Sequence, residues 1–391
     1  MSDNYEQYEI ERKKIREANQ KGFDDSTGRL QQAGLASKLQ TALQDAVRNP
    51  DTRFPGALLY VSSPEIGAWA GAAGLSDVAA ITALGLDAEF RAASILKTFV
   101  AVVILQLAEE GRFSLDDPIT TVLPESVTSK FSASDKITVR MLLNHTSGIP
   151  EWLTEAAMGE IFSNPQRVWE VHEYLDVAAA QEPYFPPGAG WRYSNTDYNL
   201  LSLVIEQTTA SAWREKIRER IVSPLNLEST RLPEPGDLSL SDKHAHGYID
   251  MDGNLLDFTR IDSSMAGAAG GHALITTTED LARFLKAVLA GELFQNTTTL
   301  DEMLTFVKVP EDARVSRYPA SYGLGIVKLL LPGNIEMLGH TGSTGGFESF
   351  VYYVPSQHLT ISGMMSSTGS DESAILTPTL DLLVPGFLAA Q

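Results

Sequence analysis

Hydrophobic residues are spaced differently along the chain, and the spacing predicts where helices and strands lie. Every fourth position is apolar between residues 35 and 47, which is the spacing of one face of an amphipathic helix. Short continuous apolar runs follow at 56–62 (GALLYVS) and 66–71, and such runs predict buried strands joined by a tight connection. One helix and two strands are therefore expected at the start of the folded part.

Strand-like runs return in the C-terminal third, where β-branched and aromatic residues are bounded by glycine, proline or polar residues. The predicted strands are 323–330, 335–340, 349–354 and 359–365, with a helix over 373–388 at the end. Thr344, Gly345 and Gly346 predict a hairpin turn between the second and third of these strands.

The region between the two groups of strands, from about residue 98 to 269, reads as mainly helical. Helices are predicted over 98–108, 139–143, 168–180, 198–208 and 213–221, and another over 278–290 that begins at Thr277 or Thr278. Gly148 is expected to cap the helix over 139–143. Strands at both ends with helices between them predict one antiparallel sheet built from both ends of the chain.

Composition narrows the possible functions. The chain has 391 residues, 43% of them hydrophobic, and a net charge of −20, which argues against nucleic acid or an anionic membrane surface as a partner. It has no cysteine, so disulfides, thiolate catalysis and cysteine metal sites are excluded. No window has the ~18 apolar residues of a membrane span. The polar N-terminus lacks the apolar core of a secretory signal, so a cytoplasmic protein is expected if the chain is complete, and an exported one if a signal was removed.

Ser94 and Lys97 form a Ser-x-x-Lys motif at the start of the apolar helix over 98–108. Residues three apart share one face of a helix, so the hydroxyl and the amine lie close together. Free backbone N–H groups at the start of the helix can hold an oxyanion. The motif alone is weak, because a capping serine followed by a solvated lysine has the same pattern.

Two further motifs strengthen this reading. Tyr193-Ser194-Asn195 follows a Pro-Pro-Gly turn and supplies, on a predicted loop, a phenol that can move a proton and an amide that can donate and accept. His340-Thr341-Gly342-Ser343 lies at the edge of a predicted strand, where a glycine permits close approach of a substrate backbone. A capped turn explains the first motif and a hairpin explains the glycines of the second, but neither explains all three motifs together.

In this order, the three motifs resemble those of the penicillin-recognising serine hydrolases. The Tyr-Ser-Asn form is similar to the branch with class C β-lactamases, D-alanyl-D-alanine carboxypeptidases, D-amino-acid amidases and related esterases. Other stretches also resemble that branch: 90–94 (FRAAS), 142–148 (LLNHTSG), 267–271 (GAAGG) and 276–282 (TTTEDLA). The resemblance covers roughly residues 36 to 385.

The resemblance implies a β-lactamase/transpeptidase-like fold of the α/β (α+β) class, with an antiparallel β-sheet flanked by helices, an inserted all-helical subdomain and the site in the cleft. Residues 1–34 are then a polar N-terminal extension, helical around 8–20. Residues 35–391 form a single catalytic unit, with an α/β part (35–93 and 270–391) and a helical part (94–269).

The resemblance also implies roles for the motif residues. Ser94, Lys97 and Tyr193 are the expected catalytic residues, and the substrate-binding residues are Asn195, His340, Thr341, Gly342 and Ser343. The implied activity is acyl-enzyme hydrolysis of a small-molecule or short-peptide substrate: a small amide, a D-amino-acid peptide or an ester. The alternatives are a β-lactamase, or a slow-turnover protein that binds β-lactams or peptidoglycan fragments. No metal or other cofactor is implied, and the oligomeric state is left open.

His340 departs from the lysine that familiar β-lactamases of this superfamily carry at its position. An unperturbed imidazole has a pKa near ~6.5, so it lacks the permanent charge that would hold a substrate carboxylate. Efficient β-lactam hydrolysis is therefore disfavoured. If an imidazolium does bind carboxylates, that binding is expected to weaken as the pH rises through roughly 6–7.

Two other segments carry expectations. His145, at the end of the helix over 139–143, is expected to bond local backbone. The glycine-rich stretch 267–271 is expected to be closely packed backbone behind the site, because it lacks the spacing of a dinucleotide-binding loop.

Overall fold

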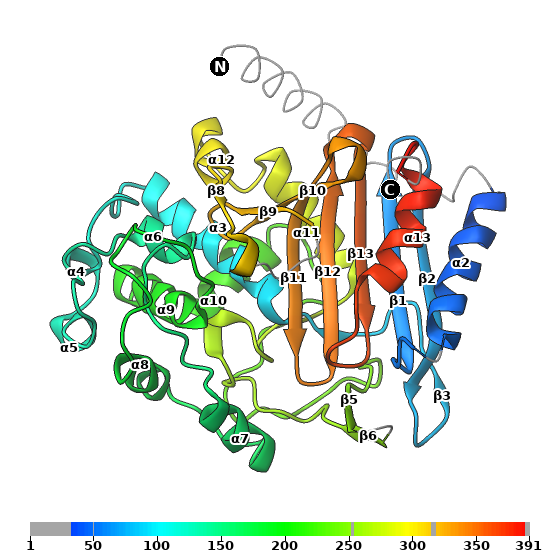
Figure 1. The fold of residues 1–391 in the computed structure, drawn as a ribbon, viewed down its shortest axis with the longest axis horizontal. Coiled ribbons are helices and arrows are strands. Elements are labelled where there is room, and N and C mark those ends of the chain that lie inside the picture. The colour runs from blue at the N-terminus through cyan, green and yellow to red at the C-terminus, as the bar shows by residue number, and fades with distance from the viewer. Residues whose placement is uncertain (1–32, 50, 252–253, 314–317, 388–391) are drawn as a thin grey trace.

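An antiparallel sheet forms the centre of the molecule in the computed structural model of this chain (Figure 1). The structure describes residues 33–49, 51–251, 254–313 and 318–387, so the helix predicted over 8–20 lies outside it. Within that part of the chain the sheet has nine strands in the order β3-β2-β1-β13-β12-β11-β10-β9-β8. The first strands thus pair directly with the last, which confirms a single sheet built from both ends of the chain.

Strand boundaries follow the hydrophobic runs closely in the centre of the sheet. The central strands are β1 (Gly56–Ser63), β2 (Gly67–Asp77), β11 (Ile335–Thr344), β12 (Phe347–Val354) and β13 (Leu359–Met365). The outer strands are β3 (Thr82–Ala83), β8 (Val307–Lys308), β9 (Ala320–Tyr322) and β10 (Val327–Leu331). The strand predicted over 323–330 is wrong at its start, because Gly323 N–H donates to the Ile326 carbonyl and closes a turn.

Helices cover both faces of the sheet. The helices α2 (Ala33–Arg48) and α13 (Ser373–Leu383) pack on one face, and α11 (Thr278–Ala290) packs on the other (Figure 1). The alternation along β1 matches this arrangement, since Leu59 packs in the core beneath α2 and α13 whereas Leu58 belongs to the core shared with α11. Two hydrophobic layers therefore hold the sheet.

The helical region lies beside the sheet and is built around α3 (Leu96–Glu109), which is buried from Leu96 through Leu105. Its other helices are α4 (Ile119–Val122), α5 (Glu125–Thr128), α6 (Val139–Leu143), α7 (Glu155–Ser163), α8 (Val171–Ala179), α9 (Asn195–Thr209) and α10 (Trp213–Ile217). A later helix, α12 (Thr297–Met303), also contacts α3. A π-helical turn, Arg218–Val222, continues α10. The division into an α/β part and a helical part remains a prediction.

Two small pairs of strands were not predicted. The hairpin of β5 (Tyr248–Met251) and β6 (Asn254–Asp257) interrupts the region expected to be helical, and β4 (Phe90–Arg91) pairs with β7 (Ile275–Thr276). The second pair positions the site, because β4 ends three residues before Ser94.

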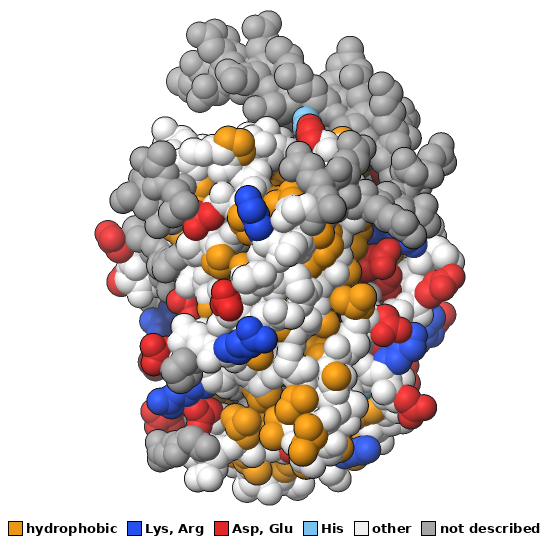
Figure 2. Space-filling view, turned by 90° about the vertical axis from the view of Figure 1, so that its right-hand side faces the viewer, with side chains coloured by type: hydrophobic (Ala, Val, Ile, Leu, Met, Phe, Trp, Pro, Cys, Tyr) orange, Lys and Arg blue, Asp and Glu red, His pale blue; other side chains and the backbone are white. Residues whose placement is uncertain are grey.

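The face of the molecule that carries α2 has no basic patch among the described residues (Figure 2). Figure 2 shows lysine and arginine side chains scattered there among acidic ones, as far as the described residues extend. None of the described helices has the length and apolar character needed to cross a membrane.

Candidate active site

Ser94 lies in a single 3₁₀ turn, Ala93–Ile95, that leads directly into α3. Ala93 has a left-handed backbone with φ 51°, a conformation that is uncommon for a residue with a side chain and recurs at functional sites. Gly270, at φ 124°, lies against this turn, and a Cβ there would be 2.7 Å from the Ser94 Cα. The glycine-rich segment is therefore closely packed backbone behind Ser94, as expected.

Lys97 is completely buried beside Ser94. Its Nζ lies 3.0 Å from the Ser94 Oγ and 2.8 Å from the Asn195 Oδ1, and it also contacts the Ala269 carbonyl oxygen. Burial lowers the Lys97 pKa to about 7, although the negative charges of Glu151 and Asp197 oppose that shift. A large fraction of the amine is therefore neutral at physiological pH.

The contacts of Lys97 fix where its lone pair points when it is neutral. A neutral amine has two N–H donors and one lone pair. The Asn195 Oδ1 and the Ala269 carbonyl can only accept, so the two N–H groups are directed to them. The lone pair then faces the Ser94 hydroxyl, which is the orientation a base needs.

Glu151 orients Asn195, and this acid was missed in the sequence. Its Oε2 accepts from the Asn195 backbone N–H and from the Asn195 Nδ2, each at 2.9 Å. Because a carboxylate only accepts, Nδ2 must face Glu151, which leaves Oδ1 for Lys97. Asn195 is the first residue of α9, so it does not lie on the predicted loop; the helix begins three residues before its predicted start at Tyr198.

Tyr193 is held over Lys97 by the segment that precedes it. Its ring centroid is 4.7 Å from the Lys97 Nζ and 4.4 Å from the ring centroid of His145. Burial raises the Tyr193 pKa above its ordinary value, with hydrogen bonding to Ser94 as a smaller opposing effect. Tyr193 is therefore a neutral phenol at physiological pH. Lys97, with a pKa of about 7, is the neighbour of Ser94 that can gain or lose a proton in that range.

His145 is not bonded only to local backbone, so that expectation was wrong. Its buried Nδ1 lies 3.0 Å from the Asp197 Oδ2, and the Ser147 hydroxyl donates to the other oxygen of Asp197 at 2.6 Å. His145 also has φ 62° directly after the C-cap of α6, so it takes the left-handed position that was assigned to Gly148. The His145 ring packs against the Tyr193 ring, and its Nδ1 accepts from the Ser194 N–H. The His145–Asp197 pair therefore helps to position Tyr193.

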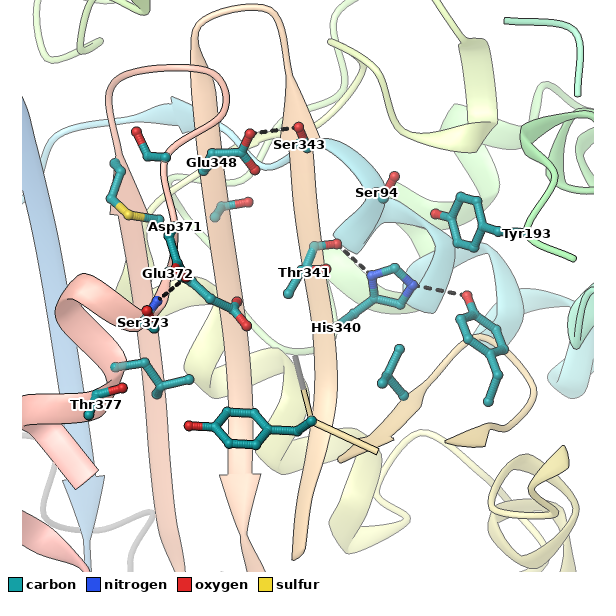
Figure 3. A pocket seen from close by; sticks show the side chains of 17 residues that line it. Ser94, Tyr193, His340, Thr341, Ser343, Glu348, Asp371, Glu372, Ser373 and Thr377 are labelled. Atoms are coloured by element: carbon teal, nitrogen blue, oxygen red, sulfur yellow. Dashed lines mark hydrogen bonds between the residues drawn. The ribbon is translucent and has the colours of Figure 1, made fainter. Parts of the chain in front are cut away.

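His340 lies on β11 with both ring nitrogens occupied (Figure 3). Its Nδ1 lies 2.6 Å from the Thr341 carbonyl oxygen and must carry the proton, so its Nε2 accepts from the Tyr322 hydroxyl at 2.9 Å. Burial, together with the charge of Lys97, lowers the His340 pKa to about 3. The expected titration between pH 6 and 7 is therefore not supported, because His340 stays neutral throughout that range.

The remaining residues of the third motif line up along β11. Thr341 and Ser343 face a cavity of about 540 Å³ that also contains Ser94, Tyr193 and His340. Gly342 faces the turn that carries Ser94 instead, and a Cβ there would lie 2.1 Å from the Ala92 carbonyl oxygen. The close approach of the protein's own backbone therefore explains this glycine. The sequence had instead suggested that it makes room for the backbone of a substrate.

Comparison with known proteins agrees with this geometry. The family model described as Beta-lactamase matches residues 33–385. The chain belongs to the beta-lactamase family. Both the predicted family of penicillin-recognising serine hydrolases and the predicted fold class are thereby confirmed.

The similar proteins are named as an esterase, a penicillin-binding protein and an amidohydrolase. The chain is 28% identical to Esterase EstB of Burkholderia gladioli over 71% of the chain and 76% of that protein. It is 27% identical to Penicillin-binding protein 4* of Bacillus subtilis over 67% of the chain but only 57% of that protein. Among solved structures, a D-stereospecific amidohydrolase from Streptomyces sp. is 32% identical, with a TM-score of 0.78 over 90% of this chain and 98% of the other.

The Gly342→Ala substitution is expected to lower the free energy of unfolding by about 1–3 kcal/mol, because the new methyl group must displace the Ala92 carbonyl. Urea unfolding followed by fluorescence measures the change. Gly159→Ala in α7 is the matched control, since nothing lies within 4 Å of the place its new methyl group would take and alanine favours a helix. Equal stability of the Gly342 variant and the natural protein would contradict this packing.

The Glu151→Gln substitution is expected to move the rise of kcat/KM to lower pH. The base form of Lys97 exists above its pKa, and removal of the nearby negative charge lowers that pKa further. The rate itself is expected to fall by up to about 100-fold, because glutamine has one acceptor oxygen, whereas Glu151 uses one oxygen for Asn195 and the other for the Leu153 N–H. A pH–rate profile beside that of Glu125→Gln, an exposed change in α5, measures both effects. An unmoved midpoint would show that Glu151 does not act through Lys97.

Proposed function

We propose that this chain hydrolyses small amides, D-amino-acid peptides or esters through an acyl-enzyme on Ser94. The observation that carries the proposal is the arrangement around Lys97, whose two acceptor contacts direct its lone pair to the Ser94 hydroxyl. The named relatives, an esterase and a D-stereospecific amidohydrolase, support these substrate classes.

The acylation step follows from these contacts. Lys97 takes the Ser94 proton while the Ser94 Oγ bonds to the substrate carbonyl carbon. Backbone N–H groups of Ser94 and Ser343 hold the resulting oxyanion, which is worth roughly 3–4 kcal/mol for each donor. As the carbonyl re-forms, Tyr193 gives its proton to the departing amine or alcohol and recovers one from the Lys97 ammonium.

Deacylation uses the same residues in the opposite direction. A water molecule gives its proton to Lys97 and bonds to the acyl carbon. The Ser94 oxygen then leaves and is protonated, so the enzyme returns to its starting state. Asn195 and Glu151 act by keeping Lys97 and the substrate aligned.

The test compares three substrates on the natural protein: p-nitrophenyl hexanoate, D-phenylalanine amide and nitrocefin. The ester, the amide or both are expected to be turned over, with nitrocefin hydrolysed far more slowly. Neither ring nitrogen of His340 is free to bind the carboxylate of nitrocefin, which is the physical reason for the difference. Nitrocefin turnover faster than both other substrates would favour the β-lactamase alternative, and acylation without turnover would favour the binding protein.

A further inference from the structure

The cavity in front of Ser94 extends well beyond the catalytic residues. It crosses the face of β11 and reaches β12, β13 and the start of α13 (Figure 3). Ser94 and Tyr193 lie at one end, and Glu348, Asp371 and Glu372 lie on the other side of β11. A substrate in contact with Ser94 can therefore also reach this second region, which we call the acidic end of the cavity.

The described lining of the cavity holds no cationic side chain for a substrate carboxylate. Among the described residues that line the cavity, none is lysine or arginine. His340 lies between the two ends, but its Nδ1–H is donated to the Thr341 carbonyl and its Nε2 accepts from Tyr322. The imidazole in the described lining is thus neutral and already hydrogen-bonded.

Glu348 retains a carboxylate oxygen for a ligand. Both hydrogen bonds that it accepts within the described part of the chain end on Oε1, from the Ser343 hydroxyl at 2.7 Å and from the Gly369 N–H at 2.8 Å. These bonds fix the side chain on β12 next to the His340–Ser343 motif. Its Oε2 stays available, and Asp371 and Glu372 add negative charge from the loop before α13.

The electrostatics of the cavity follow from these groups. A cleft lined by charges of one sign concentrates their field and attracts a ligand of the opposite sign. The Glu348 pKa is raised to about 7 by burial, so this carboxylate gains its charge as the pH rises through neutrality. Asp371 and Glu372 face the same space from the far side.

We propose that the substrates of this hydrolase carry an ammonium group that Glu348 binds at the acidic end, and that substrates with a carboxylate at the same place are rejected. This inference rests on the proposed function and specifies its substrate class. A primary ammonium supplies three N–H donors, and Glu348 Oε2 supplies the acceptor at the end of the cavity remote from Tyr193.

The test uses two sets of substrates that differ only in one terminal charge. The first set is the p-nitrophenyl esters of hexanoic acid, 6-aminohexanoic acid and adipic acid, which place the charge on the acyl side. The second set is the acetate esters of 1-hexanol, 6-aminohexanol and 6-hydroxyhexanoate, which place it on the leaving side. In at least one set, kcat/KM at pH 8 is expected to be at least about tenfold higher for the cationic member than for the neutral one, and lowest for the anionic member.

Two variants test whether Glu348 causes the preference for cationic substrates. In Glu348→Gln the ratio of kcat/KM for the cationic and neutral members is expected to fall at least about fivefold, whereas exposed Glu125→Gln in α5 should leave it unchanged. The ratio cancels any general loss of activity in the variant. If Glu348→Gln does not fold, the natural protein still provides a test, because added salt should reduce its cation preference.

The outcomes separate this inference from the proposed function. Ser94-dependent hydrolysis of the neutral members with equal rates for all three charges would overturn the ammonium site and leave the hydrolase intact. A cation preference that survives in Glu348→Gln would place the site elsewhere. Loss of hydrolysis of every neutral member would overturn the proposed function itself.

Discussion

Replacing Ser94 with alanine is expected to lower kcat by about 10⁴–10⁶ for every substrate that the natural protein hydrolyses. The structure gives the reason for so large an effect. The Lys97 lone pair faces one proton donor, the Ser94 hydroxyl, while its N–H groups are bonded to Asn195 and Ala269. Removing the hydroxyl therefore removes both the nucleophile and the partner of the base.

Initial rates and intact-mass measurements after treatment with a fluorophosphonate test this expectation together. The natural protein should gain one adduct, and Ser94→Ala should gain none. Ser126→Ala, an exposed change in α5 far from the cavity, should keep both the adduct and the rate. An adduct that forms on Ser94→Ala would contradict the assignment of the nucleophile.

Elements with a strong local signal could be predicted from the sequence. The strand Leu359–Met365 and the helix Thr278–Ala290 lie where their patterns placed them, because the strand is a bounded apolar run and the Thr277 side chain accepts from the Asp280 N–H. The short pair β4 and β7 has only two residues in each strand, so it carries no periodicity to detect.

The supporting residues of the site could not be predicted in the same way. Glu151 and Asp197 reach Asn195 and His145 from 44 and 52 residues away, and neither separation has a local pattern. Nor did the sequence indicate that the Tyr322 hydroxyl donates a hydrogen bond to the His340 Nε2. That contact depends on the pairing of β9, β10 and β11. The motifs predicted which side chains react, whereas the tertiary contacts show which partners their polar atoms have.

Lys97→Ala and Tyr193→Phe are each expected to lower kcat by about 10²–10⁴. In the proposed mechanism the two side chains act as one unit, because the proton that Lys97 takes from Ser94 replaces the one that Tyr193 gives to the leaving group. The double variant should therefore lose far less than the product of the two single losses. Fully multiplicative losses would show that the two residues act independently.

Lys97→Arg and the pH dependence distinguish a base from a fixed positive charge. In the natural protein kcat/KM should rise with pH through about 7, because burial lowers the Lys97 pKa and only the neutral amine accepts a proton. Tyr193→Phe should keep this rise at a lower rate, since the raised Tyr193 pKa leaves the phenol protonated over the same range. Arginine keeps the charge but cannot lose its proton, so Lys97→Arg should be as inactive as Lys97→Ala. If Lys97→Arg retained substantial activity with a pH-independent rate, the positive charge of Lys97 would be its contribution, and another group would have to deprotonate Ser94.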